Sequence, residues 1–269
     1  MNRHQIHQRL QAWEPWWSIL RYVLVMAVLL WLGGRGAGNL GYNWQWYRIS
    51  EYIGTVQQGE LSLGPLLQGL LVTLKITGVS LLLSLVFGLG AALLRLLPSV
   101  MGRLVARVYL ELIRNTPLLI LIFFIYFVIG PLFGIGRFFS AVLALSLFEG
   151  AYASEIFRAG IVSIHRGQWE AAYCLGLSNW DMYRKIILPQ ALRRIIPPLT
   201  SQAVSLVKDS ALVSTIAVYD LTMRGQALVA ETFLAFEVWF TVAGLYLVLT
   251  ITLSALAWGL ERKMAADSA

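Results

Sequence analysis

Four charged residues stand inside or beside long apolar stretches of this sequence. They are Glu149, Glu155, Lys208 and Asp209. Because a charge at the centre of a bilayer costs roughly 2.5–3.5 kcal/mol on insertion scales, these side chains should face a polar cavity or each other. A zwitterionic solute needs a carboxylate for its cationic group and a cation or a backbone N–H for its carboxylate. Glu155 and Lys208 can supply those two contacts.

Pairing within the protein is the alternative for each of these charges. Glu155 and Arg158 are three residues apart on a helix and can bond to each other. Lys208 and Asp209 are adjacent, so on a helix they point in different directions. Glu149 and Glu155 lie about 120° apart around a helix, so both need not line one site. Weaker candidates for contact with a solute are Tyr152, Ser210 and Thr73.

No residue pattern indicates catalysis, a metal or a bound cofactor. The sequence has no Gly-x-x-x-x-Gly-Lys-Ser/Thr phosphate loop. It offers no nucleophile–base arrangement. Cys174 is the single cysteine, which excludes an intrachain disulfide and a cysteine metal cluster. We therefore expect no catalytic residue, no metal ligand and no cofactor on this chain.

The composition is that of a membrane protein. The 269 residues are 58% hydrophobic and 13% charged, with a mean hydropathy of +0.69, whereas a soluble domain carries about 25% charged and about 45–50% apolar residues. We expect an all-α, polytopic transmembrane bundle with about six spans, since roughly 20 apolar residues cross a bilayer. The expected spans are residues 19–32, 66–97, 109–130, 138–164, 195–219 and 233–260.

Two of these spans contain polar or small residues that affect how the helix forms or packs. The fifth is interrupted by polar residues. In the second, Ser80, Ser84 and Gly88 recur at four-residue spacing. Such a face lets another helix approach closely.

Lysine and arginine predict the orientation of the chain. With the N-terminus in the cytoplasm, 15 of the 21 Lys and Arg residues lie on the cytoplasmic side and 4 outside, while Lys75 and Lys208 lie within spans. The positive-inside rule then places both termini in the cytoplasm. The same distribution explains the net charge of +7 through membrane topology and lipid headgroups, without nucleic acid.

The first span resembles both a membrane anchor and a signal peptide. Arg3 and Arg9 precede an apolar stretch, as in a signal peptide. However, the charged and aromatic segment before that stretch is long, and no clear small-residue cleavage site follows it. We expect a retained anchor, and a mature protein beginning near Gly41 is the alternative. The external segment 33–65 contains several aromatic residues, which favour a membrane interface.

The polar segment 165–190, here called the elbow, predicts two short helices joined by a turn. Residues 169–175 include strong helix formers, and Gly176 can close that helix in a left-handed cap. Pro189 is expected to end the second helix. Candidates to cap its start are Ser178, Asn179 and Asp181. A rigid elbow on the cytoplasmic side is a surface that another protein can bind.

The elbow resembles the cytoplasmic signature of ABC importer permeases. That signature is Glu-Ala-Ala, three residues, Gly, nine residues, Ile, any residue and Leu-Pro. The matching residues are Glu170, Ala171, Ala172, Gly176, Ile186, Leu188 and Pro189. The resemblance implies that the elbow forms coupling helices that dock into a cleft of an ATPase subunit. An ordinary amphipathic helix pair at the membrane surface would not require this spacing.

The resemblance extends from about residue 66 to the C-terminus. It is closest to the polar amino-acid permeases, which handle histidine, glutamine, glutamate, aspartate, arginine and opines. The stretches that carry it are 69–74, 111–118, 151–161 and 206–213, and the run 148–152 is similar to glutamate and aspartate permeases. Residues 66–269 are therefore expected to form the permease domain. Residues 1–65 are expected to add a cytoplasmic tail, an extra helix and an external loop.

What the resemblance implies is a transport subunit rather than an enzyme. The substrate class is polar amino acids, either acidic or neutral-polar ones such as glutamate, aspartate and glutamine. Cationic amino acids are the alternative, and an ion-coupled secondary transporter working through Glu155 and Asp209 is a further one. ATP and Mg²⁺ would be bound by a partner ATPase dimer. The other implied partners are a second permease chain, as a heterodimer rather than a homodimer, an external substrate-binding protein and the lipid of a bacterial inner membrane.

Overall fold

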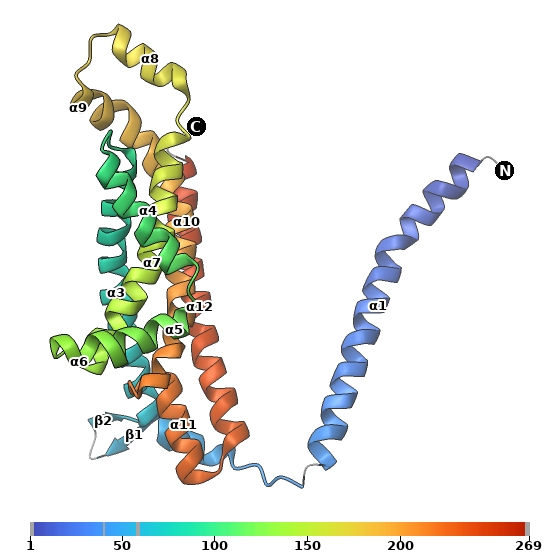
Figure 1. Ribbon diagram of the computed structural model, residues 1–269. Helices are drawn as coiled ribbons and strands as arrows, with labels where there is room; N and C mark the ends of the chain where they lie inside the picture. The colour runs from blue at the N-terminus through green and yellow to red at the C-terminus, as the bar shows by residue number, and fades with distance from the viewer. Residues whose placement is uncertain (1–2, 40, 58–59, 267–269) are drawn as a thin grey trace. The chain divides into compact units, whose positions relative to one another are not determined.

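The first compact unit of the chain is a single helix. The structure, a computed structural model, describes residues 3–39, 41–57 and 60–266, which divide into the units 1–45 and 46–269 (Figure 1). In the first unit, helix α1 (Arg3–Asn39) contains an apolar stretch of 20 residues, Trp17–Gly36, with exposed side chains. The expected first span, 19–32, lies inside this stretch.

The second unit is a helical bundle with one small hairpin at its start. The 3₁₀ turn η1 (Trp46–Arg48) and helix α2 (Ile49–Ile53) precede strands β1 (Gly54–Gln57) and β2 (Glu60–Leu63), which pair antiparallel with Gly54 opposite Leu63. The remaining elements are α3 (Pro65–Leu96), α4 (Val100–Arg114), α5 (Leu118–Phe123), the π-helical turn η2 (Phe124–Ile129), α6 (Gly130–Phe133), α7 (Arg137–Val162), α8 (Arg166–Cys174), α9 (Asn179–Met182), the π-helical turn η3 (Tyr183–Ile187), α10 (Leu188–Asp209), the 3₁₀ turn η4 (Ser210–Ile216), α11 (Leu221–Thr232) and α12 (Ala235–Ala266). The expected all-α class is confirmed.

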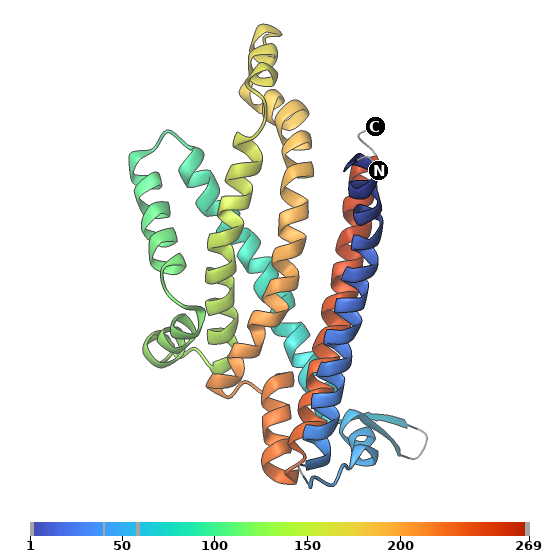
Figure 2. The same cartoon turned by 90° about the vertical axis from the view of Figure 1, so that its right-hand side faces the viewer.

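Three helices of this unit, α3, α7 and α12, are long and apolar enough to cross a membrane. They correspond to the expected second, fourth and sixth spans. All three end at one end of the bundle, where the elbow also lies (Figure 2). The elbow and the last turn of α12 therefore lie at the same end of the bundle.

The expected third span, 109–130, is wrong as a single helix. Helix α4 ends at Arg114, and the chain turns by 108° before the helical segment Leu118–Phe133. The break follows from Pro117, which disfavours helical backbone in the residue before it. Asn115 reinforces the stop, because its amide donates to the carbonyl oxygen of Glu111 at 2.8 Å.

The expected fifth span, 195–219, is displaced along the sequence. Helix α10 begins at Leu188, and the chain passes into the tighter turn η4 after Asp209. Within the described residues, α10 is long enough to span a membrane but lacks the apolarity that marks the other spanning helices. Two prolines and several charged residues along it are the physical reason.

Small residues allow α3 and α7 to pack closely. A Cβ atom added at Gly88 would lie 2.7 Å from the Cβ of Ala153, and one added at Gly150 would lie 3.2 Å from the carbonyl oxygen of Ser84. The Ser80–Ser84–Gly88 face expected to accept another helix therefore packs on α7. Buried serines assist, because the hydroxyl of Ser80 donates to the carbonyl oxygen of Val142 at 3.4 Å and that of Ser146 donates to the carbonyl oxygen of Ser80 at 3.4 Å.

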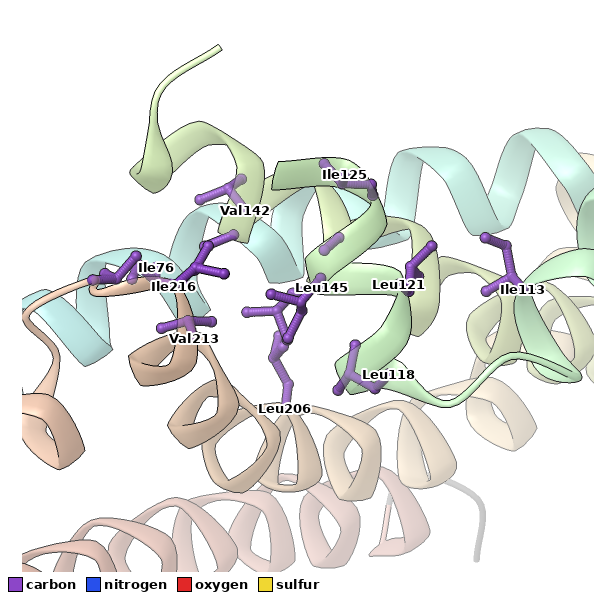
Figure 3. Close-up of a cluster of buried hydrophobic side chains, with 14 of the residues drawn as sticks. Ile76, Ile113, Leu118, Leu121, Ile125, Val142, Leu145, Leu206, Val213 and Ile216 are labelled. Carbon is purple, nitrogen blue, oxygen red and sulfur yellow. The ribbon is translucent and has the colours of Figure 1, made fainter. Parts of the chain in front are cut away.

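The largest apolar core joins this helix pair to the rest of the bundle. Figure 3 shows Ile76 of α3, Leu145 of α7 and Leu206 of α10 in one cluster with side chains from α5 and η4. Burial of a large aliphatic side chain contributes about 1.5–3 kcal/mol. The cluster thus fixes α7, which carries Glu149 and Glu155, against its neighbours.

The Gly88→Val variant tests the α3–α7 contact. Overpacking at a closed interface costs about 1–3 kcal/mol, so we expect a lower melting temperature for the solubilised chain. Gly90→Val is the matched control on the same helix, because a Cβ at Gly90 meets nothing within 4 Å. Thermal unfolding of both variants measures the difference, and equal melting temperatures would contradict the packing described.

Candidate functional site

The first helix of the elbow, α8, ends in a complete left-handed cap. Gly176 has φ +66°. Its N–H donates to the carbonyl oxygen of Tyr173 at 2.9 Å, and the N–H of Leu177 donates to that of Ala172 at 3.2 Å. These two bonds define the Schellman motif, in which glycine takes the left-handed position without steric cost. The cap expected at Gly176 is confirmed, and it fixes the direction in which the chain leaves α8.

The second helix of the elbow is capped by Ser178. Its hydroxyl oxygen accepts from the N–H of Asp181 at 3.2 Å. The Asp181 carboxylate pairs in turn with Lys185 at 2.7 Å. The hydrogen bond from Lys185, followed by that from Ser178, lowers the pKa of Asp181 below its ordinary value. Of the three candidate caps, Ser178 therefore holds the N-cap position.

The expectation that Pro189 ends this helix is wrong. The chain stays helical from α9 through the π-helical turn η3 into α10, and Pro189 lies in the first turn of α10. The π-helical turn η3 lies directly before Pro189 and changes the hydrogen-bond pattern at the point where proline supplies no N–H. The elbow is consequently continuous with α10.

The signature residues of the elbow divide between its interior and its surface. Ala172 is fully buried in a cluster that also contains Met182 and Ile187, and Ile186 packs against this cluster. The signature residues Glu170, Ala171, Gly176, Leu188 and Pro189 are exposed. Large apolar side chains beside them are also exposed, with Tyr173 at 58%, Leu175 at 75% and Trp180 at 72%. Apolar side chains gathered on an otherwise polar segment mark an interaction site.

Glu155 is the centre of an ion-pair cluster rather than a free carboxylate. It bonds to Arg95 of α3 at 2.6 Å, to Arg114 of α4 at 3.3 Å and to Arg158 of α7 at 3.2 Å. The pair with Arg158 was considered from the sequence. Arg95 and Arg114 were not, because the folding of the chain alone brings them to α7. The cluster ties three helices together near the end of α7 that leads to the elbow.

The same carboxylate lines a cavity of about 430 Å³, here called the arginine cavity. Its lining residues are Arg95, Arg103, Arg107, Leu110, Glu111, Arg114, Asn115, Tyr152 and Glu155. Tyr152 packs on Phe148, with 5.1 Å between ring centroids, and the Arg114 guanidinium lies 5.7 Å from its ring centre. Tyr152 and Glu155 therefore share one cavity. Lys208 is not among the residues that line it.

Glu149 and Asp209 form a second polar cluster, between α7 and α10. Glu149 is 1% exposed, and its Oε2 accepts a hydrogen bond from the side-chain amide of Gln202. Asp209 lies within electrostatic reach of Glu149 and of the exposed Lys208. No donor among the described residues bonds to Glu149 Oε1. Gln202 was missed from the sequence, although a polar amide in an expected span is a usable signal.

Thr73 and Ser210 make structural hydrogen bonds. The Thr73 hydroxyl accepts from the N–H of Leu221 at 3.1 Å and donates to the carbonyl oxygen of Gly69 at 3.2 Å, which joins α3 to the start of α11. The hydroxyl of Ser210 donates to the carbonyl oxygen of Val207 at 2.7 Å. The structure thus separates the solute-binding candidates into the arginine cavity, the Glu149–Asp209 cluster and these two bracing hydroxyls.

Solved structures share this arrangement of helices. A crystal structure described as an amino acid ABC transporter with histidines aligns with a TM-score of 0.70 and 37% identity, over 74% of this chain and 94% of that one. The inward-facing MetNI methionine ABC transporter aligns with a TM-score of 0.65 and 22% identity, over 74% of this chain and 96% of that one, and is a likeness of fold.

Sequence relatives cover nearly the same share of the chain. The glutamine transport system permease protein GlnP of Escherichia coli K12 is 41% identical over 202 residues, which are 74% of this chain and 92% of that protein. The putative glutamine transport system permease protein GlnP of Rickettsia felis is 37% identical over 203 residues, with the same shares. Residues 84–266 match the family model described as binding-protein-dependent transport system inner membrane component. The chain belongs to this family of membrane transport components.

Proposed function

We propose that this chain is the transmembrane permease subunit of an ATP-driven importer for polar amino acids, and that its elbow docks into a cleft of a separate ATPase. One observation carries this proposal. The signature residues of the elbow lie on a capped, internally packed knob that also exposes the large apolar side chains of Tyr173, Leu175 and Trp180. A rigid, partly apolar knob needs a partner, and the chain has no phosphate loop with which to bind ATP itself.

The mechanism that fits this geometry is alternating access. The elbow runs without a break into α10, and α10 contacts both α7 and α12. Closure of an ATPase pair would move the elbow and α10 as one body, and the bundle would switch between outward and inward access. Glu155 would act as a gate, because three helices must separate or shift together where it binds its arginines.

The partners and the location follow from the same proposal. ATP and Mg²⁺ bind to the partner ATPase dimer, and this chain holds no cofactor. A second permease chain, preferably a different one, completes the translocation pathway, and an external binding protein delivers the solute. The elbow and both termini lie on the cytoplasmic side of a bacterial inner membrane. In support, the elbow and the end of α12 lie at the same end of the bundle (Figure 2).

The Glu149–Asp209 cluster is the proposed contact for the solute. A buried carboxylate oxygen with no donor, beside a second carboxyl group, is an acceptor for an ammonium group. Lys208, next to Asp209, can receive the solute carboxylate. Such a site fits an acidic or neutral-polar amino acid such as glutamate, aspartate or glutamine, in keeping with the names of the glutamine permeases that this chain resembles.

Cationic amino acids are the second candidate, because two carboxyl groups in one cluster also suit a cationic side chain. Uptake of labelled glutamine and labelled glutamate into proteoliposomes containing the purified complex separates the two. Unlabelled glutamine, glutamate or aspartate should compete, whereas arginine and lysine should not. Competition by arginine alone would contradict the preferred substrate class.

The Gly176→Asp variant tests the elbow. A side chain at φ +66° strains the Schellman cap and places a charge on the docking surface. We expect ATP-driven uptake to fall at least about tenfold, a change of about 1.4 kcal/mol, with unchanged amounts of the chain in the membrane. Gly134→Asp is the matched control, since Gly134 has the same φ of +66° and open space around it but lies outside the elbow. Normal uptake by Gly176→Asp, or uptake without any ATPase, would contradict the proposed coupling.

The Glu149→Gln variant tests the solute contact. A hydrogen bond to a charged group contributes about 1.5–3 kcal/mol, so we expect the KM for uptake to rise about tenfold to a hundredfold. Glu231→Gln, at an exposed position, is the control for loss of one carboxylate. Uptake kinetics in proteoliposomes give KM and kcat separately, and an unchanged KM would remove Glu149 from the site.

A further inference from the structure

Two arginines of the arginine cavity have no partner for their charge among the described residues. Arg95 and Arg114 bond to Glu155, and the Glu111 carboxylate accepts from the Asn115 amide at 2.9 Å. Within residues 3–39, 41–57 and 60–266, no ion pair or side-chain hydrogen bond engages Arg103 or Arg107. Both guanidinium groups line the cavity, which therefore holds an excess of positive charge.

The sequence of α4 places these arginines on one of three distinct faces. At about 100° per residue, Arg103, Arg107 and Arg114 fall on one side of the helix. The buried residues Ala106, Leu110 and Ile113 fall on the next side, toward the bundle. The side farthest from the bundle is apolar and exposed, and it comprises Met101 at 67%, Leu104 at 52%, Val105 at 53%, Val108 at 49% and Leu112 at 64%. A basic face thus borders an uncovered apolar face.

This pairing of faces has a clear chemical complement. The planar guanidinium group binds phosphate through two parallel N–H···O bonds. A free phosphate would need only the arginines, whereas a phospholipid also needs an apolar surface beside them for its acyl chains. Helix α4 offers both surfaces along its length. Neutral lipid would leave the excess positive charge of the cavity unmatched.

We propose that the arginine cavity binds the headgroup of an anionic phospholipid, with Arg103 and Arg107 on the phosphate and the acyl chains along the exposed apolar face of α4. Because Arg95 and Arg114 line the same cavity, the bound phosphate lies beside the cluster around Glu155. The bound lipid therefore lies next to the ion pairs of Glu155 that join α3, α4 and α7.

The test compares lipids on the purified, full-length chain. Native mass spectrometry and thermal unfolding in detergent are measured with dioleoyl phosphatidylglycerol, dioleoyl phosphatidylcholine and soluble glycerol 3-phosphate. We expect phosphatidylglycerol to be retained and to raise the melting temperature, and its affinity to exceed that of phosphatidylcholine at least about tenfold. Equal effects of the two lipids would overturn the proposal. Binding of glycerol 3-phosphate as tight as that of phosphatidylglycerol would also overturn it, because the cavity would then be a site for soluble anions.

Variants locate the site. Arg103→Gln with Arg107→Gln should weaken phosphatidylglycerol binding at least about tenfold, and both side chains are exposed, so the fold should be retained. Arg166→Gln with Arg184→Gln removes the same charge from exposed positions outside the cavity and should leave lipid binding unchanged. Leu104→Ser, on the apolar face, should weaken phosphatidylglycerol binding without a change at either arginine. Retention of full affinity in the Arg103/Arg107 variant, or equal losses in the control pair, would reject this location.

Discussion

The close approach of α3 to α7 is the contact on which the polar groups of the bundle depend. A Cβ at Gly88 would collide with Ala153 and one at Gly150 would be crowded by α3, so the two glycines let the helices lie against each other along buried serines. With the helices so close, Arg95 at the end of α3 reaches Glu155 on α7. Apolar packing by Ile76, Leu145 and Leu206 holds the pair in this position. Small residues in the middle of the bundle thus decide where the charges meet.

The sequence predicted the elements that depend on local rules. The cap at Gly176 needs only a glycine after a helix, and the long apolar helices need only composition. The break at Asn115–Pro117 was within reach of the same rules, but the expected span extended the apolar run that follows Pro117 back across it. Arg95, Arg114 and Gln202 lay beyond prediction, because each meets its partner across helices far apart in the sequence. Such contacts follow from packing, which a single sequence does not display.

Two surfaces at one end of the bundle differ in chemistry, and each suits a different kind of partner. The elbow presents aromatic and aliphatic side chains on a rigid scaffold, which suits a protein partner. The arginine cavity presents two guanidinium groups, those of Arg103 and Arg107, that pair with no described residue, beside an exposed apolar helix face, which suits a charged amphiphile. Both surfaces border α7, which carries Glu149 and Glu155. Binding at either surface therefore acts on Glu149 and Glu155 through the same helix, α7.

The unbroken passage from the elbow into α10 has a mechanical consequence. At about 1.5 Å per residue, the 22 residues of α10 form a rod of about 33 Å, with Pro189 near one end and Asp209 at the other. If the rod pivots at its elbow end, a tilt of about 10° displaces the far end by about 6 Å, roughly the length of one helical turn. Pro189, which was expected to end a helix, is instead part of a lever arm. A small rotation imposed at the membrane surface is thereby enlarged into a displacement that could open or close the contact between Glu149 and Asp209.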